Sequence, residues 1–271
     1  SQIVAINPQQ WNTKTGFKKL ISHFYNQTYI LIDSKQKKED DAFNLNPFET
    51  NNSNLLGLNF NLNNSFYFNK GLKKYSTTYL FINSKNKNTT TIDNLENSTQ
   101  QHKLQFEHKL GSFWQFNFDV SNSVNKTVSL NYGNRNYELN NAGIFPKISY
   151  YYNTNTYFSL FFEAKKKENQ IGNLETLASN KFGLEINYTN NSKNLLKAAI
   201  NLFNNKFEGN NNSPIAYQML EGLQPGKNYT WSLLFYRKIN SFLNLNLNYL
   251  GRKSETSKTI HTGTIQLKAI F

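Results

Sequence analysis

Side-chain polarity alternates residue by residue along much of this chain, and this pattern limits the fold more than any other feature. Between Leu243 and Tyr249 every odd-numbered residue is apolar and every even-numbered residue is asparagine. Successive side chains of a β-strand point to opposite faces of a sheet, so this stretch predicts a strand with one apolar and one polar face. The same alternation recurs from Lys181 to Tyr188 and from Leu196 to Leu202.

The same alternation, followed along the whole chain, predicts about twelve strands. Each is long enough to cross a bilayer at a tilt, which requires roughly 9 to 11 residues. Leu104 to Leu110 and Trp114 to Val120 form a typical pair, joined by Gly111 and Ser112. Residues 1–27 contain Pro8 and Gly16 and show no clean alternation. We therefore expect a lead-in segment at 1–27 and a β region at 28–271.

The predicted connections alternate between short and long. Short links fall near Gly111 to Ser112, Asn153 to Asn155, Asn190 to Lys193 and Ile239 to Ser241, with a somewhat longer one around Asn64 to Lys73. The long polar segments are Ser34 to Asn54, Asn83 to Gln101, Ser121 to Pro146, Lys166 to Ser179, Asn204 to Asn228 and Gly251 to Thr262. Short turns on one side and long loops on the other are the order expected of an outer-membrane barrel, whereas a Greek-key sandwich does not require it.

The fold class predicted from these patterns is all-β, an antiparallel up-and-down transmembrane β-barrel located in the bacterial outer membrane. Two alternatives remain for its wall. In the first, the twelve or so strands close into a barrel by themselves, which pairs every backbone donor and acceptor. In the second, they form the last part of a larger barrel.

Composition removes several other classes. No stretch approaches the roughly 18 consecutive apolar residues of a transmembrane helix, and the absence of cysteine removes disulfides and thiolate zinc sites. The formal net charge of +13 fits nucleic acid, anionic lipid head groups or acidic glycans as partners, and charge alone does not choose between them. The basic residues are scattered rather than gathered in one run. The densest group, Lys165 to Lys167, is interpreted as part of a solvated loop.

Polar residues on the alternating strands are the candidates for the lining of a water-filled lumen, where carboxylates and lysines form ion-paired networks. These lumen-facing residues are Glu107, Lys109, Glu163, Lys181, Glu185, Lys197, Asn244 and Asn246.

The C-terminal stretch carries the most specific local motif. Ile265, Leu267, Ala269 and the terminal Phe271 share one face of a predicted strand. A strand that ends in an aromatic carboxy-terminal residue resembles the segment by which the outer-membrane assembly machinery recognises barrel proteins. We therefore interpret these four residues as an assembly signal.

Three further stretches carry a resemblance to a family. Tyr217 to Trp231, Tyr249 to Glu255 and Ile260 to Gly263 resemble a C-terminal pattern of large, mostly uncharacterised outer-membrane proteins of the Bacteroidota type. The resemblance covers about the last fifty residues. It implies an outer-membrane address and a longer parent chain, and it carries no catalytic residues.

No catalytic, cofactor-binding or metal-binding residues are predicted. His102 and His108 share a strand but are separated by about 20 Å along it, too far to share a metal. Gly222 to Lys227 superficially resembles a phosphate loop, but Asn228 stands where serine or threonine should bind magnesium. The Pro225 and Gly226 pair instead indicates a turn.

The function predicted from the sequence is non-enzymatic: a solute channel or transporter in a Gram-negative cell envelope, or a membrane scaffold of an envelope complex. The expected partners are outer-membrane lipid, lipopolysaccharide, the assembly machinery and other envelope proteins, without nucleic acid or cofactor. The alternative is a soluble extracellular β-sandwich, an adhesin-like binding module, in which the apolar faces pack against each other.

Overall fold

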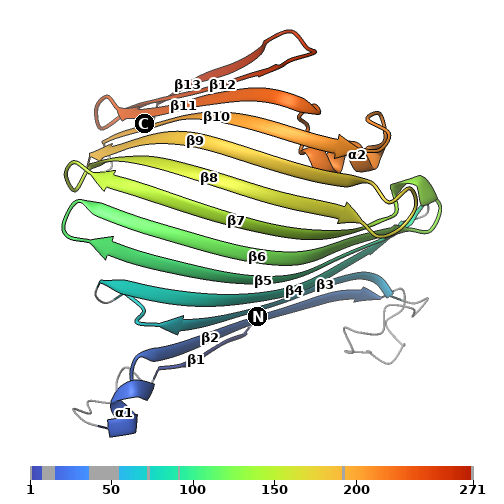
Figure 1. Ribbon diagram of the computed structural model, residues 1–271, viewed down its shortest axis with the longest axis horizontal. Helices are drawn as coiled ribbons and strands as arrows, with labels where there is room; N and C mark the ends of the chain where they lie inside the picture. The colour runs from blue at the N-terminus through green and yellow to red at the C-terminus, as the bar shows by residue number, and fades with distance from the viewer. Residues whose placement is uncertain are drawn as a thin grey trace.

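The computed structural model describes residues 2–7, 16–36, 55–71, 74–90, 92–190 and 193–269. Figure 1 shows one continuous sheet in which the strands lie side by side in chain order. The strands are β1 (Gln2–Ile6), β2 (Phe24–Gln36), β3 (Leu55–Phe68), β4 (Tyr75–Thr89), β5 (Asn94–Leu110), β6 (Trp114–Ser129), β7 (Tyr137–Tyr151), β8 (Thr156–Asn169), β9 (Thr176–Asn190), β10 (Asn194–Glu208), β11 (Gly226–Lys238), β12 (Leu243–Ser254) and β13 (Ile260–Ala269). The helices are α1 (Gly16–Ile21), α2 (Pro214–Leu220) and the 3₁₀ turn η2 (Gly133–Arg135).

Every neighbouring pair of strands is antiparallel, so the described residues form an up-and-down meander of 13 strands. At its centre Ile200 lies opposite Leu184 on one side and opposite Trp231 on the other. The predicted all-β, antiparallel, up-and-down fold is confirmed. None of the helices in the described residues is both long and apolar enough to span a membrane.

The two faces of the sheet differ sharply. The apolar face carries large hydrophobic side chains that are nevertheless exposed. They are Val4, Ile6, Ile32, Phe66, Tyr75, Tyr79, Leu104, Leu110, Trp114, Val120, Val128, Ile144, Ile148, Phe158, Leu160, Phe162, Phe182, Leu184, Ile200, Leu202, Tyr229, Ile265 and Leu267. The polar face carries Ser149 and Ser159, which are 3% and 1% exposed and hydrogen-bonded at 2.8 Å. Polar side chains crowd together in this way on the inner side of a curved sheet.

On most strands the apolar face is hydrophobic over only part of the length. We call the edge with the short links the turn edge and the opposite edge the loop edge. On β8, Phe158, Leu160 and Phe162 lie toward the turn edge, and Lys166 and Glu168 follow at the loop edge. β6 and β10 repeat this order. The hydrophobic residues therefore form a band beside the turn edge, which we call the hydrophobic band.

Beyond the band, the strands continue into segments that the sequence pattern placed in loops. β4 runs to Thr89, and β5 begins at Asn94, inside the segment expected to be a long connection. The segments Ser121 to Pro146, Lys166 to Ser179 and Gly251 to Thr262 are likewise mostly strand, and their connections are 130–136, 170–175 and 255–259. Most of the predicted long connections are therefore much shorter than expected, and the predicted strict alternation of short and long connections is wrong.

The physical reason is that both faces of these extensions are polar. Alternation disappears where neither face is apolar, while the backbone hydrogen bonds of the ladder continue irrespective of side chain. Lys165 to Lys167 belong to β8 and not to a solvated loop. Connection 209–225 is the long one that remains, and it contains α2; residues 37–54 lie outside the described residues.

The N-terminal segment contributes one strand more than expected. β1 pairs with β2, with Ile3 opposite Tyr29, and α1 lies between them in the sequence. Both fall within the predicted lead-in segment 1–27, whose boundary with the β region remains a prediction.

The two outer strands of the sheet point the same way. β1 and β13 both run from the loop edge to the turn edge, as the first and last members of an odd-numbered meander must. A direct pairing between them would be parallel. Within the described residues each pairs with a single neighbour, β2 or β12.

Candidate functional site

The polar face of β5 to β9 holds a network of ion pairs. Lys147 Nζ lies 2.7 Å from Glu185 Oε2, and Lys103 Nζ lies 2.8 Å from Asp119 Oδ2. Glu163 forms ion pairs with two lysines: its oxygens lie 2.9 Å from Lys165 Nζ and 3.7 Å from Lys181 Nζ. Lys147–Glu185, Lys103–Asp119 and Lys181–Glu163 join different strands, whereas Lys165 and Glu163 both lie on β8. Several of these side chains remain partly exposed, so water reaches the network.

Aromatic rings lie among these charges on the same face. Phe161 is 4% exposed and covers Gly183 on the neighbouring strand, where a Cβ atom would overlap the ring. Phe145 packs against Phe161 with ring centroids 5.2 Å apart. The Lys181 ammonium lies 4.9 Å from the Phe161 centroid, a distance at which a cation is attracted to the ring. The centre of the polar face is thus both charged and well packed.

Helix α2 covers the polar face at the loop edge. Ser213 begins it: its hydroxyl accepts a hydrogen bond from the Ala216 N–H, and Pro214 occupies the first helical turn. Glu221 ends the helix in the left-handed conformation at φ 55°. The buried side of α2 forms a hydrophobic cluster with β7 and β9; its members are Leu139, Leu177, Ile215, Ala216, Met219 and Leu220.

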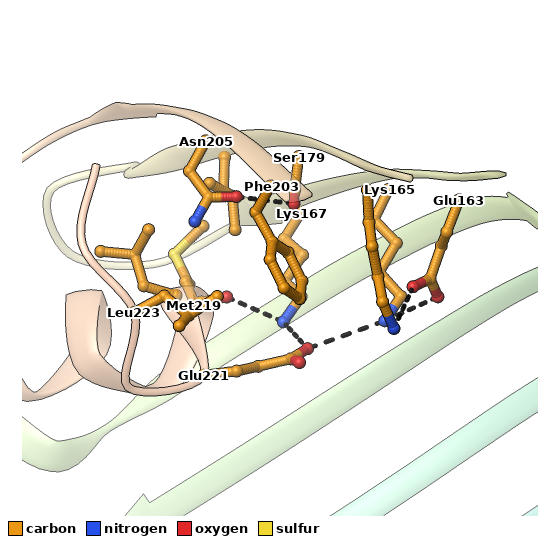
Figure 2. Close-up of a pocket in the computed structure, with 12 residues that line it drawn as sticks. Glu163, Lys165, Lys167, Ser179, Phe203, Asn205, Met219, Glu221 and Leu223 are labelled. Carbon is orange, nitrogen blue, oxygen red and sulfur yellow. Dashed lines mark hydrogen bonds and ion pairs between the residues drawn. The ribbon is translucent and has the colours of Figure 1, made fainter. Parts of the chain in front are cut away.

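A lysine of β8 fastens the end of α2 to the sheet. Lys167 Nζ donates to the Met219 carbonyl oxygen at 2.8 Å and to Glu221 Oε1 at 2.7 Å. Lys165 Nζ lies 3.8 Å from the same carboxylate oxygen. Figure 2 shows Lys167 and Lys165 pointing toward the Glu221 carboxylate beside the end of α2. The cavity that these residues line has a volume of about 80 Å³. Connection 209–225 is therefore folded inward, onto the polar face.

The electrostatics of Glu221 reflect this position. Partial burial acts to raise the pKa of its carboxyl, but the hydrogen bond from Lys167 and the charges of Lys167, Lys165 and Lys181 outweigh it, so the pKa lies below its ordinary value. The carboxylate is thereby kept ionised and paired.

A second connection supports the loop edge. Glu175 is 1% exposed, and its Oε2 accepts a hydrogen bond from Asn169 Nδ2 at 2.7 Å. Gly209 lies against it, at φ 142°, and a Cβ atom there would come within 2.6 Å of the Glu175 side chain. Connections 170–175 and 209–225 are therefore packed together beside α2.

All eight residues predicted to line a lumen fall on the polar face by the register of the sheet. Glu163 is brought within 3.7 Å of Lys181, and Glu107 within 4.0 Å of Lys109. Glu185 instead pairs with Lys147, which was not among the candidates. Whether this face encloses a lumen remains a proposal.

Sequence reasoning missed the partners from distant segments. Glu221 lay in a predicted long loop, and Lys167 in a presumed solvated cluster. The Ser213 and Pro214 pair was the available signal for the start of α2. Of the predicted assembly signal, Ile265, Leu267 and Ala269 lie on the apolar face of β13, and Phe271 lies outside the described residues.

The histidines occupy unrelated places. His102 and His108 lie on the apolar face of β5, and His261 Nδ1 is hydrogen-bonded to the Tyr249 hydroxyl at 2.7 Å. In the described part of the chain, no three side chains of the types that bind metals are grouped so that they could hold an ion.

Comparisons with known proteins give structural neighbours only. No family model matches the chain, and no curated protein matches it. The family resemblance noted in the C-terminal sequence therefore remains a prediction.

Solved structures with a similar strand arrangement are outer-membrane proteins. The OmpTdeltaL8 loop-deletion mutant from Vibrio cholerae has a TM-score of 0.45 and 8% identity, over 91% of this chain and 89% of that one. The NanC porin has a TM-score of 0.41 and 10% identity, over 80% and 94%. The translocator domain of autotransporter NalP from Neisseria meningitidis has a TM-score of 0.33 and 11% identity, over 79% and 80%.

Proposed function

We propose that this sheet is part of the wall of a bacterial outer-membrane β-barrel that conducts small hydrophilic solutes. One observation carries the proposal: the same strands expose aliphatic side chains on one face and hold ion pairs on the other. Leu184 is 39% exposed, while Lys181 and Glu185 on the opposite face form ion pairs. In a membrane barrel the lipid stabilises the first face and water the second.

A soluble sandwich arranges its faces the other way. There the apolar residues pack between two sheets and the polar residues face the solvent. Here Ile200 and Phe182 are 56% and 50% exposed at the centre of the sheet, whereas Ser159 on the polar face is buried. This distribution supports contact of the apolar face with hydrocarbon.

Aromatic side chains border the hydrophobic band, as expected at the two head-group layers of a membrane. Trp114 and Tyr150 pack against each other at the turn edge with ring centroids 4.8 Å apart. On the other border Trp231 Nε1 donates to the Tyr249 hydroxyl at 3.3 Å. In this orientation the turn edge faces the periplasm, and the loop edge with α2 faces outward.

The inward-folded connection 209–225 supports a conduit rather than an inert wall. Helix α2 covers β7 and β9 on the polar face, and Lys165, Lys167 and Glu163 line the pocket beside its end. A solute that crosses at this point passes charged groups of both signs. The helix therefore acts as the constriction, and the ion pairs around it discriminate among solutes.

The barrel of this proposal has more than 13 strands. Strand edges cannot remain unpaired in hydrocarbon, and bacterial barrels of one chain have even numbers of antiparallel strands. Because β1 and β13 run in the same direction, an odd number of additional strands is needed for an antiparallel closure. The larger of the two barrels considered from the sequence is thus the one favoured.

A scaffold role in an envelope complex is the second candidate, and one observation favours it. Strand β13 is exposed along its length, with Ile265 73% and Leu267 62% exposed. A free edge with apolar side chains is suited to pairing with a strand of another envelope protein, or with the assembly machinery during insertion.

Reconstitution into planar bilayers tests the proposed function. The protein extracted from outer membranes should produce ion currents, and Met219→Asp, which places a charge in the cluster that docks α2, should increase the single-channel conductance. Tyr217→Asp is the matched control, because Tyr217 is exposed on the same helix. A protein that inserts into the bilayer but carries no current would contradict the conduit and agree with the scaffold role. Recovery in the aqueous fraction would contradict both.

A further inference from the structure

Four cationic side chains lie on the polar face of the last four strands, β10 to β13, which are neighbours in the sheet (Figure 1). They are Lys197 on β10, Lys238 on β11, Arg252 on β12 and Lys268 on β13, and all four are exposed. The described residues of these strands place no carboxylate on the same face. This part of the polar face is therefore purely cationic.

The carboxylates of the adjoining segments already have partners. Glu185 on β9 lies 2.7 Å from Lys147, and Glu255, which follows β12, lies 3.9 Å from Lys227. Within the residues that the structure describes, none of the four cations of β10 to β13 forms an ion pair. Their positive charge is thus not neutralised on this face, in contrast to the ion-paired network of β5 to β9.

The cations stand at three levels along the strands. Arg252 lies opposite Thr230 of β11, and Lys197 lies opposite Leu234 of the same strand. Thr230, Leu234 and Lys238 follow one another at intervals of four residues, which is about 13 Å along a strand at about 3.3 Å per residue. The three levels together span about 26 Å, which is close to the apolar band of about 25 Å in outer-membrane barrels.

The two end levels lie at the two edges of the sheet. At the turn edge, Lys238 and Lys268 both lie opposite Asn244, so their backbones are about 10 Å apart across three strands. Toward the loop edge, Arg252 Nη1 donates a hydrogen bond to the Gly222 carbonyl oxygen at 3.3 Å. The series of cations therefore begins beside connection 209–225 and ends at the short links.

We propose that these cations form a track along which the conduit passes small anions, such as chloride and phosphate. The inference rests on the proposed conduit and adds the charge of its solutes. Arginine and lysine side chains select anions in membrane pores, and unneutralised cations raise the local concentration of anions. Conduction also requires that an ion can leave each site, which a series of separate, water-exposed sites allows.

The reversal potential in planar bilayers tests the track, with a gradient of potassium chloride centred on about 0.1 M, where charges act over about 10 Å. The protein extracted from outer membranes should pass chloride more readily than potassium. Lys197→Glu with Lys238→Glu reverses the charge at two levels and should lower the chloride-to-potassium permeability ratio about tenfold. Lys197→Gln with Lys238→Gln should lower it by a smaller factor, and it replaces the first variant if that variant does not fold.

The matched control is Lys206→Glu with Lys253→Glu, which reverses two lysines of β10 and β12 on the apolar face. Its permeability ratio should change less than about twofold, because salt screens charges outside the conduit. A preference of the native protein for potassium, an unchanged ratio in the Lys197 and Lys238 variants, or an equal change in the control would overturn the track and leave the conduit standing. Absence of current from the membrane-inserted native protein would contradict the conduit itself, and the track with it.

Discussion

The Lys167 ammonium of β8 lies 2.7 Å from the Glu221 carboxylate at the end of α2, although the two residues are 54 apart in the sequence. The Lys167 side chain is 11% exposed, and it also caps the Met219 carbonyl. This contact joins the connection 209–225 to the wall of the sheet. It makes the position of the helix sensitive to one lysine.

Replacing that lysine should release the helix. Lys167→Met removes hydrogen bonds to a carboxylate and a carbonyl, which for a charged group contribute about 1.5–3 kcal/mol. We expect faster proteolysis within 209–225 and faster hydrogen exchange of the α2 amides, with the rest of the sheet unchanged. Lys166→Met, on the opposite face of β8, is the control and should leave both rates as in the unmodified chain. Equal rates in the two variants would contradict the role of Lys167.

Acid should release the helix as well. The pKa of the Glu221 carboxyl is lowered by Lys167 and Lys165 in the folded protein, against the opposing effect of burial. A carboxylate of this kind stabilises the fold above its unfolded pKa, and the stabilisation is lost as the pH falls through the folded pKa. The protection factors of the α2 amides, which compare the measured exchange with the intrinsic rate at each pH, should therefore be high at neutral pH and fall below pH 4.5. Glu221→Gln should show fast exchange already at neutral pH and little further change; a variant with the same pH profile as the native chain would refute this assignment.

Gly183 is needed for the packing of Phe161. A Cβ atom at position 183 would overlap the ring, so Gly183→Ala should destabilise the sheet by about 1–3 kcal/mol through overpacking. The measurement is the temperature at which the protein stops migrating as a folded band on a denaturing gel and migrates as the unfolded chain. Gly143→Ala, where the nearest atoms lie at 3.4 Å, should have a smaller effect. In the double variant with Phe161→Ala the two losses should not add, because the ring that causes the clash is gone.

The direction of the outer strands can be tested with disulfides, since the chain has no cysteine of its own. Asn246→Cys with Gln266→Cys places thiols on directly opposed residues of β12 and β13, and this pair should oxidise. Ala5→Cys with Gln266→Cys joins β1 to β13 and should stay reduced in the membrane-inserted protein. Oxidation of the second pair to the same extent would show that the 13 strands close on themselves.

The faces of the sheet could be predicted from the sequence wherever one face meets water and the other does not. Leu243 to Tyr249 and Lys181 to Tyr188 follow this pattern, and the register places their side chains as expected. The pattern failed at Lys166 to Ser179 because both faces are polar there, and a strand with two polar faces has the composition of a loop. The periodicity of side-chain polarity carries no information in such a segment. Backbone hydrogen bonds to the neighbouring strands alone determine that it is a strand.

The candidate site was predictable only in part, because its contacts join distant segments. Polarity placed Glu185 and Lys181 on the inner face, but the partner of Glu185 is Lys147, which is 38 residues away. That pairing depends on the register of three strands, which no local pattern specifies. Helix α2 has seven residues and gains its stability from Leu139 and Leu177 of the sheet, so its own sequence indicates little beyond the capping at Ser213.

Arginine on the apolar face should be costly. Leu247→Arg, in the middle of the hydrophobic band, should destabilise the inserted protein by about 2–4 kcal/mol, whereas Asn246→Arg, the adjacent residue on the polar face, should change stability little. Urea unfolding in lipid vesicles measures the difference. Equal losses at the two positions would argue against a lipid environment.

The most direct test of the membrane arrangement is a cysteine scan of β12 from Leu243 to Tyr249 in native outer membranes. Each variant carries one thiol and is exposed to a water-soluble, membrane-impermeant reagent. We predict that positions 244, 246 and 248 react and that positions 243, 245, 247 and 249 are protected, with a period of two residues along the strand. Uniform reaction along the strand, or protection of the asparagine positions instead, would contradict the placement of the apolar face in hydrocarbon.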